Sequence, residues 1–210
     1  GDRKTEAEKA RWWQFVRPRH EMRSALQPLS HAIVMPRVSP HLIVSRQSSR
    51  VCFDGQLMVV ALCSNYHLAV LQSRYHVAWA WARCSTLKGD LRYTNTTAFE
   101  TFPFPSFPDG HYAPRVMPTY DAAVAAEGAG LEFNKLRGAL CKKHQLGLTK
   151  IHNMLEAGDL PELTAAYEKL NDAVTRAYGF PEGTWRDDKA ILGLLLQRNL
   201  EVARLPAGAI

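Results

Sequence analysis

Short apolar stretches alternate with polar breaks over residues 31–63. The stretches are rich in β-branched side chains, and Ser-Pro, Ser-Ser-Arg and Asp-Gly separate them. Strands have this length and composition, and turns have such breaks. We therefore expect four strands of a single sheet, over residues 31–38, 41–47, 50–54 and 56–63.

The apolar spacing then changes to a helical period. Leu68, Leu71 and Tyr75 share one face of a helix expected over residues 65–85. The same period returns after Pro118 and continues almost to the last residue. Helix formers also dominate the segments that precede the strands, at residues 5–15 and 20–29.

These elements predict an α+β fold in two parts. Pro, Gly and Asp cluster over residues 108–118, where the composition changes from strand-rich to helical. We expect a mixed β-sheet domain with flanking helices over residues 1–112 and an all-α domain over residues 113–210.

Residues 85–105 carry polar and aromatic side chains in an unusual order. If this segment is extended, Lys88, Asp90 and Arg92 point the same way and place a cation, an anion and a cation in one row. Alternatively, Lys-Gly-Asp forms a hairpin turn with solvated charges. We expect the phenylalanines of the following Phe-Pro segment to pack, while Pro103 and Pro105 stiffen its exit.

The composition is that of a globular protein. Hydrophobic residues make up 46% and charged residues 22% of the chain. No run of about 18 apolar residues suggests a membrane span, and the charged N-terminal segment lacks the apolar core of a signal peptide. We expect a cytoplasmic protein with buried, reduced cysteines, since none of the four cysteines forms a C-x-x-C pair that would favour zinc.

The basic charge is confined to the first half of the chain. Residues 1–110 hold 14 Lys and Arg against 8 Asp and Glu, a net of +6, whereas residues 111–210 hold 12 of each sign. Eleven of those 14 cations are arginine, whose planar fork suits phosphate and guanine. A nucleic-acid-binding face fits this asymmetry, and so does a surface that is merely soluble.

Catalytic motifs are missing. The chain has no glycine-rich nucleotide loop, no HExxH and no GxSxG. His67 and His76 lie nine residues apart, which is not a metal-binding spacing on a helix, so we expect packing or hydrogen-bonding roles. The residues alone indicate a binding module that uses no metal or cofactor of its own.

The order of four motifs resembles a known family. WWQFVRPRHEMRSAL (12–26), MPRVSPHLIV (35–44), the segment 68–105 that ends RYTNTTAFETFPFP, and GLTKIHNMLEAGDLPELTAAYEKLNDAVTRAYG (147–179) are similar to the C-terminal part of MmeI-like type IIL restriction–modification enzymes and related large adenine DNA methyltransferases. In that family, an adenine methyltransferase domain precedes a target-recognition domain and a helical domain. The resemblance implies that this chain is the recognition end, that its partners are double-stranded DNA and its own N-terminal methyltransferase domain, and that S-adenosylmethionine binds in that domain.

The resemblance also implies which residues contact bases. Family members vary two residues, two positions apart, just before the arginine-tyrosine strand, and these are Lys88 and Asp90 here. Arg92 occupies another position tied to recognition. Lysine can donate to guanine O6 and N7 and aspartate can accept from cytosine N4, so the pair suits one G·C base pair, with Arg92 on a neighbouring purine.

Four further arginines are candidates for contacts with the DNA backbone, which set register and affinity. They are Arg37, which could also contact a base, Arg46, Arg74 and Arg83. A surface ion pair of little energetic value is the alternative for each.

Two other classes of function stay open. The chain could be a non-catalytic protein-interaction or scaffolding domain, with the C-terminal helices as its working surface and an incidental basic half. It could also be a stand-alone enzyme of unknown type, although no motif supports that.

Overall fold

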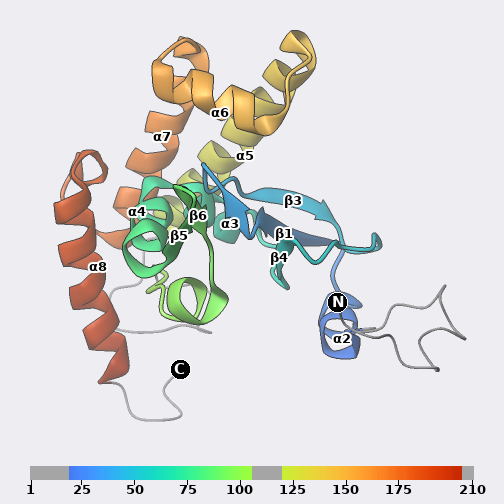
Figure 1. The fold of residues 1–210 in the computed structure, drawn as a ribbon. Helices are drawn as coiled ribbons and strands as arrows, with labels where there is room; N and C mark the ends of the chain where they lie inside the picture. Colours follow the sequence, from blue (N-terminus) through green and yellow to red (C-terminus); the bar gives the residue numbers. More distant parts are fainter. Residues whose placement is uncertain (1–18, 106–119, 205–210) are drawn as a thin grey trace, which may run out of the picture.

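The computed structural model describes residues 19–105 and 120–204 (Figure 1). The expected helix over residues 5–15 and the expected boundary at 108–118 lie outside the described residues. Before residue 106 the elements are α2 (His20–Leu26), β1 (His31–Pro36), β2 (Val38–Ser39), β3 (Ser45–Ser48), β4 (Leu57–Val60), α3 (Asn65–Gln72), α4 (Arg74–Arg83), β5 (Ser85–Leu87), β6 (Asp90–Arg92) and the π-helix η1 (Asn95–Phe99). After residue 119 they are α5 (Tyr120–His144), α6 (Leu148–Ala157), α7 (Pro161–Tyr178), the 3-10 helix η2 (Thr184–Arg186) and α8 (Asp188–Ala203).

This architecture confirms the α+β class but corrects the sheet. The strands form two small antiparallel sheets, in the orders β3-β1-β4 and β2-β6-β5, rather than a single one. Residues 50–54, expected as a strand, form a loop. The expected helix over residues 20–29 is present but shorter, as α2.

A bend at Arg37 explains why one extended stretch serves two sheets. The Arg37 N–H donates to the Gln56 carbonyl beside the first sheet at 2.8 Å, and the Arg37 carbonyl accepts from the Tyr93 N–H at the end of β6, also at 2.8 Å. The residue after the bend, Val38, pairs with Arg92 in the second sheet. The chain therefore passes from one sheet to the other within a single residue.

The expected helix over residues 65–85 is two helices. Ser73 interrupts it in an extended conformation, with its hydroxyl donating to the Val70 carbonyl at 2.7 Å. Leu68 and Leu71 of α3 pack on the sheets, whereas Ala69 and Val70 pack on the later helices. The break thus lets α3 and α4 stand between two hydrophobic clusters.

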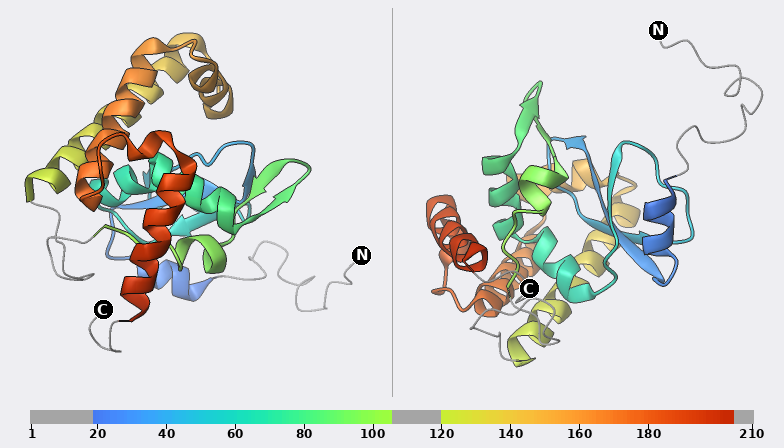
Figure 2. Two further views of the ribbon diagram at one scale, coloured as in Figure 1. Left: turned by 90° about the vertical axis from the view of Figure 1, so that its left-hand side faces the viewer. Right: turned by 90° about the horizontal axis from the view of Figure 1, so that it is seen from below.

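Those two clusters join the parts of the chain that were expected to be separate domains. Tyr75 and Trp79 of α4 are fully or almost fully buried in the same cluster as Phe133 of α5 and Leu170 of α7. Figure 1 and Figure 2 show α5 and α7 running side by side, with α8 on the other side of α4. The division at residue 112 remains a prediction, and the core on the described residues crosses it.

Gly130 marks the closest approach of α3 and α5. A Cβ atom on Gly130 would lie 2.6 Å from the Ala69 Cβ, far inside van der Waals contact. The Gln72 side chain donates to the Gly130 carbonyl at 3.2 Å and accepts from Asn134 at 2.9 Å. Small side chains at the contact and the hydrogen bonds of Gln72 therefore hold α3 of the strand-rich part against α5 of the helical part.

The segment after α4 is the other major correction. β5 and β6 pair antiparallel, with Leu87 opposite Asp90, so Lys88 and Gly89 form the two-residue turn of a hairpin. Their φ angles of 54° and 92° are those of a type I′ turn, whose twist matches that of the strands. The extended row that would include Lys88 does not exist, and the hairpin alternative is confirmed.

Two smaller expectations concern thiols and membranes. All four cysteines are free, but Cys52 and Cys63 are exposed rather than buried. In the described ranges, no helix is both long and apolar enough to cross a membrane.

Candidate nucleic-acid interface

The β5–β6 hairpin stands out from the body of the molecule in both views of Figure 2. β6 is the middle strand of its sheet, and Arg92 lies between Val38 and Ser85 on the neighbouring strands. All three side chains are exposed. Asp90 lies two residues before Arg92 on the same side of β6, about 7 Å away, while Leu91 between them is buried on the other side.

The charged groups of the hairpin have no side-chain partner among the residues that the structure describes. Within the described part of the chain, no side-chain hydrogen bond or ion pair engages Lys88, Asp90 or Arg92. Lys88 and Arg92 are exposed and Asp90 is half-buried. The structure therefore brings the three candidates together on one hairpin, with Lys88 at its tip and Asp90 and Arg92 on one strand.

A buried histidine holds the base of the hairpin. His76 lies between the Leu71 carbonyl, 2.7 Å from Nδ1, and the Tyr93 hydroxyl, 2.9 Å from Nε2. Because a carbonyl only accepts, Nδ1 carries the proton and Nε2 accepts from Tyr93. Burial lowers the pKa of His76 to about 4, opposed by the bond to Leu71, so the ring is neutral at physiological pH.

The segment after β6 supports the hairpin from below. The Thr94 N–H lies 3.3 Å from the Cys84 thiol, and Trp79 Nε1 donates to the Ala98 carbonyl in η1 at 3.2 Å. Thr94 follows β6 in an extended conformation, and the π-helix η1 begins at the next residue. η1 therefore ends the hairpin's second strand and turns the chain into the core.

The Phe-Pro segment packs as expected. Phe102 is 5% exposed, and its ring centroid lies 4.9 Å from those of both His76 and Phe104. Pro103 and Pro105 are buried, and the Pro103 carbonyl accepts from the Tyr178 hydroxyl of α7 at 3.0 Å. The segment is thus a structural anchor that ties the exit of the hairpin to the helical part.

The four expected backbone-contact arginines lie on different elements, with Arg74 and Arg83 at the two ends of α4. Arg37 is exposed, without a side-chain partner among the described residues, and its backbone is bonded to the end of β6. Arg46 on β3 donates to Asn65 at 2.6 Å. Arg74 forms an ion pair with Asp188 of α8 at 2.7 Å.

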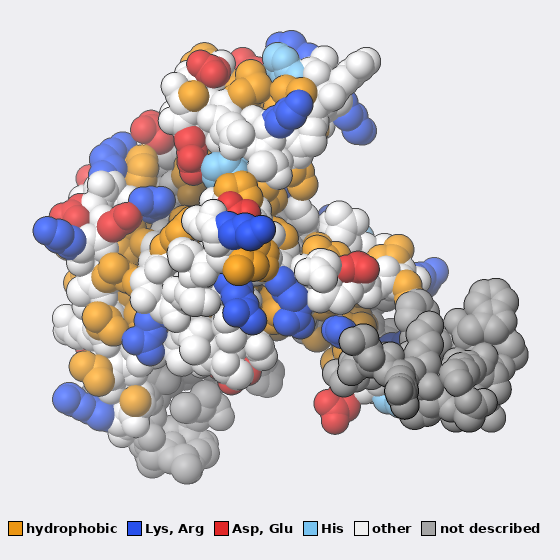
Figure 3. All heavy atoms as spheres, viewed as in Figure 1, with side chains coloured by type: hydrophobic (Ala, Val, Ile, Leu, Met, Phe, Trp, Pro, Cys, Tyr) orange, Lys and Arg blue, Asp and Glu red, His pale blue; other side chains and the backbone are white. Residues whose placement is uncertain are grey.

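Arg83, the last of the four, lies at the end of α4. Its guanidinium is 5.3 Å from the centre of the Trp79 ring. Figure 3 shows Lys and Arg side chains near the middle of the face that it presents, over the region where the two sheets meet. Of the four, Arg37 lies next to the end of β6, and its side chain has no partner among the described residues.

A polar junction that the sequence did not reveal joins the loop after β2 to the helical part. Arg137 of α5 is 3% exposed and donates to the Val44 carbonyl at 2.8 Å and to Asn134 at 2.7 Å. His41 on the same loop contacts Asn153 and Glu156 of α6 at 2.5 and 3.1 Å. The signal available in the sequence was the position of Arg137 on the apolar face that α5 buries.

The electrostatics of this junction favour one charged arginine beside a neutral histidine. Burial lowers the pKa of Arg137 to about 10, which leaves it charged at neutral pH. Burial, then the charge of Arg137 and then His41, lower the pKa of His152 to about 3. Arg137 therefore acts as a fixed donor to the loop.

Metal chemistry finds no support in the described ranges, since no group of three or more His, Cys, Asp or Glu side chains there could hold an ion. The β5–β6 hairpin is one of the described surfaces whose charged side chains have no partner among the described residues.

Comparison with known proteins gives the family. Residues 3–106 match the family model described as the MmeI target recognition domain. These residues belong to the MmeI target recognition domain family. The hairpin, both sheets and α2 to α4 all lie within the target recognition domain so defined.

Two relatives extend the likeness beyond the target recognition domain. Over 172 residues, 79% of this chain, the sequence is 28% identical to DNA methyltransferase A of Bacillus subtilis (strain 168), and the match spans 17% of that protein. A structure of the type IIL restriction–modification enzyme MmeI in complex with DNA shares the fold, with a TM-score of 0.64 and 18% identity. That match covers 85% of this chain and 22% of the MmeI chain, so the shared fold includes part of the helical region.

Proposed function

We propose that this chain is the DNA sequence-recognition module of a DNA (adenine-N6) methyltransferase or restriction–modification enzyme. The methyltransferase domain, with its S-adenosylmethionine site, would be a separate part of the same polypeptide and the partner of this chain. The family match and the DNA complex of the structural relative support this proposal. Because such enzymes act on bacterial chromosomal DNA, we also propose a cytoplasmic location.

The observation that carries the proposal is the set of unpaired charges on the hairpin. Protruding charged groups without intramolecular partners suit a macromolecular ligand, since they form ion pairs or hydrogen bonds only after binding. The major groove of B-DNA, about 12 Å wide, admits a two-stranded β-ribbon. The β5–β6 hairpin is such a ribbon, with Lys88 and Gly89 at its leading end.

Each charged side chain then has a chemically suited base. Lys88 would donate to O6 and N7 of a guanine, and Asp90 would accept from N4 of the paired cytosine. Arg92, with its two-pronged guanidinium, would contact a neighbouring guanine. Each contact of this kind discriminates against a wrong base by about 1–3 kcal/mol.

The backbone of Lys88 supports a functional role. A left-handed conformation at a residue other than glycine costs roughly 1–2 kcal/mol, and asparagine or glycine is the usual choice at this turn position. Lys88 has a φ of 54° without a stabilising contact among the described residues. Lysine at this position therefore lowers the stability of the turn and places a long, positively charged side chain at the tip of the hairpin.

The four arginines proposed to contact the DNA backbone differ in whether their side chains already have partners. The Arg37 side chain has no partner among the described residues and its backbone adjoins the end of β6, so we propose that it holds the register of the hairpin on the duplex. Arg46, Arg74 and Arg83 would have to leave Asn65, Asp188 and the Trp79 ring, respectively, to contact phosphate fully. Their proposed contribution is therefore smaller than that of Arg37.

The proposal is tested by duplex binding. We expect the chain to bind duplex DNA by fluorescence anisotropy, with an affinity that falls steeply with salt. Selection from a random duplex pool should enrich a short motif for the wild type. Arg92→Gln should lose about ten- to a hundredfold in preference for that motif, whereas Lys142→Gln, at the far end of α5, should not. A chain that binds no duplex even at low salt contradicts the proposal and favours a protein-interaction domain.

A further inference from the structure

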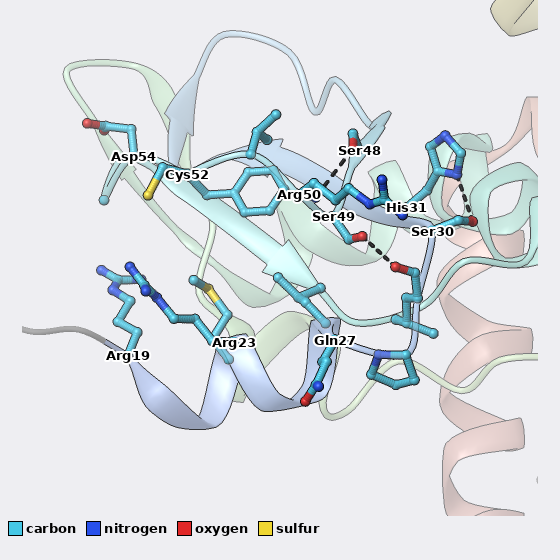
Figure 4. A pocket seen from close by; sticks show the side chains of 17 residues that line it. Arg19, Arg23, Gln27, Ser30, His31, Ser48, Ser49, Arg50, Cys52 and Asp54 are labelled. Atoms are coloured by element: carbon cyan, nitrogen blue, oxygen red, sulfur yellow. Dashed lines mark hydrogen bonds between the residues drawn. The ribbon is translucent and has the colours of Figure 1, made fainter.

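A second surface of the target recognition domain has the chemistry of an anion site. A groove of about 1190 Å³ runs between α2, the start of β1 and the loop between β3 and β4 (Figure 4). Its lining includes Arg19, Arg23 and Arg50 against the single carboxylate of Asp54. The volume is above the ~300–1,000 Å³ typical of small-molecule pockets, which favours a piece of a larger ligand.

The three arginines of the groove are unneutralised. They are exposed, and in the part of the chain that the structure describes no carboxylate pairs with any of them. Arg19 is the residue before α2 and Arg23 lies within α2, and Figure 4 shows both side chains extending toward the loop at residues 52–55, with their head groups near one another. The Arg19 guanidinium reaches to 3.7 Å from the position of a Cβ on Gly55, across the groove.

Two cations held this close without an acid between them repel one another. A phosphate placed between the two guanidinium groups would replace their repulsion with attraction to the anion, because each guanidinium can donate two parallel N–H bonds to phosphate oxygens. Figure 4 shows Arg50 farther along the groove, pointing toward the end where Ser30 and His31 lie. The cations are thus spread along the groove, as contacts with successive phosphates require.

The position of the groove relative to the hairpin indicates what the anion belongs to. Figure 3 shows the surface hollowed between the block that carries β5, β6 and η1 and the lobe that carries α2 and the first sheet. A rod-like polyanion lying across this hollow could contact both.

We propose that the Arg19–Arg23–Arg50 groove binds backbone phosphates of the DNA duplex whose bases the hairpin contacts. This inference rests on the proposed function. The groove sets affinity and register, since phosphate contacts carry no sequence information directly. Part of the basic excess of the first half of the chain would then serve to bind the DNA backbone, at a surface separate from the hairpin that contacts the bases.

The test compares two triple variants that remove the same charge. Arg19→Gln/Arg23→Gln/Arg50→Gln changes the groove, and Lys142→Gln/Arg176→Gln/Lys189→Gln changes exposed cations of α5, α7 and α8. Anisotropy titrations with duplex DNA at several salt concentrations give the slope of log affinity against log salt. Three lost phosphate contacts should reduce that slope by about 2.7 in the groove variant, with little change in the control. The ratio of affinities for the selected motif and a random duplex should stay the same.

Hydroxyl-radical footprinting on the selected duplex supplies a second readout. For the groove variant we expect protection to be lost at one edge of the footprint and kept at the motif, and Arg23→Gln alone should weaken the same edge if the triple variant does not fold. A salt slope equal to that of the control, with an unchanged footprint, overturns the inference while the proposed function stands. A wild-type chain that binds no duplex overturns both.

Discussion

Lys88 combines an unfavourable backbone conformation with a charge that no described residue neutralises, and this makes it the most informative residue of the hairpin. The family resemblance predicts a role for Lys88 in base recognition, while the sequence left its conformation open between a strand and a hairpin turn. Period-2 spacing on both sides of Lys-Gly fits one long strand as well as two short ones, because lysine is not a residue that marks a left-handed turn.

Replacing Lys88 separates its conformational cost from its proposed role. Lys88→Asn should raise the free energy of unfolding by up to about 1 kcal/mol, because asparagine tolerates the left-handed turn. Lys88→Val should lower it, since a β-branched residue is disfavoured at positive φ. Urea unfolding of the three proteins at neutral pH measures both changes. Equal stability of the Asn and Val variants would mean that the turn does not hold Lys88 at positive φ.

His76 links stability to pH. Its pKa is about 4 in the folded protein and about 6.5 in the unfolded chain, so the unfolded state binds more protons between these values. Stability should therefore fall as the pH drops through this window, by about 2 kcal/mol between pH 7.5 and pH 5 from this group. His76→Gln should show a smaller fall over the same interval, whatever its stability at pH 7.5. An identical fall in both proteins would contradict a buried neutral His76.

At the scale of elements, the structure depends on how closely helices and strands approach one another. Gly130 is one such point and Gly128 is its natural control. Gly130→Ala places a Cβ 2.6 Å from the Ala69 Cβ and should destabilise the protein by about 1–3 kcal/mol. Gly128→Ala adds its Cβ to open space in the same helix and should stabilise by about 0.5–1 kcal/mol. Thermal unfolding distinguishes the signs, and two changes of the same sign would contradict the packing of α3 on α5.

Much of the element structure could be predicted from local pattern, and the failures have local physical causes. β1 and β4 lie within the strands expected over residues 31–38 and 56–63, and α2 lies within the helix expected over residues 20–29. The segment at residues 50–54 looked like a strand by composition, but its backbone follows the turn after β3 and lines the groove with α2. The Thr-rich residues of η1 favour strands intrinsically, and the packing of Ala98 and Phe99 in the core overrides that preference.

At the scale of the whole molecule, the composition change near residue 112 hides a shared core. The sequence shows that α3 and α5 have apolar faces, but not that these faces pack against each other. Which helices pack together depends on contacts between residues that are far apart in the chain. For the same reason the sequence could not show that β6, η1 and the Phe-Pro segment are fastened to α4 and α7. The hairpin is therefore presented by both parts of the chain.

Mutation of Arg137 tests whether the polar junction holds the helical part to the strand-rich part. Arg137→Leu removes the donor to the Val44 carbonyl and leaves that buried group unsatisfied, which should cost about 1–3 kcal/mol. Arg176→Leu, on the exposed face of α7, is the control and should change stability by less than about 0.5 kcal/mol. Chemical unfolding measures both. An unchanged stability of Arg137→Leu would mean that the bond from Arg137 to the loop between β2 and β3 does not help to hold the helical part on the strand-rich part.

The most direct measurement of the central claim is methylation mapping in cells that express the full-length methyltransferase we propose contains this chain. The variant Lys88→Glu/Asp90→Arg is compared with wild type and with a charge swap of the remote surface pair, Lys169→Glu/Glu132→Lys. We predict that the first variant changes the methylated motif at one base pair, from G·C to another pair, with the rest of the motif kept, and that the remote swap leaves the motif intact. An unchanged motif at full activity in the first variant would contradict base recognition by the hairpin.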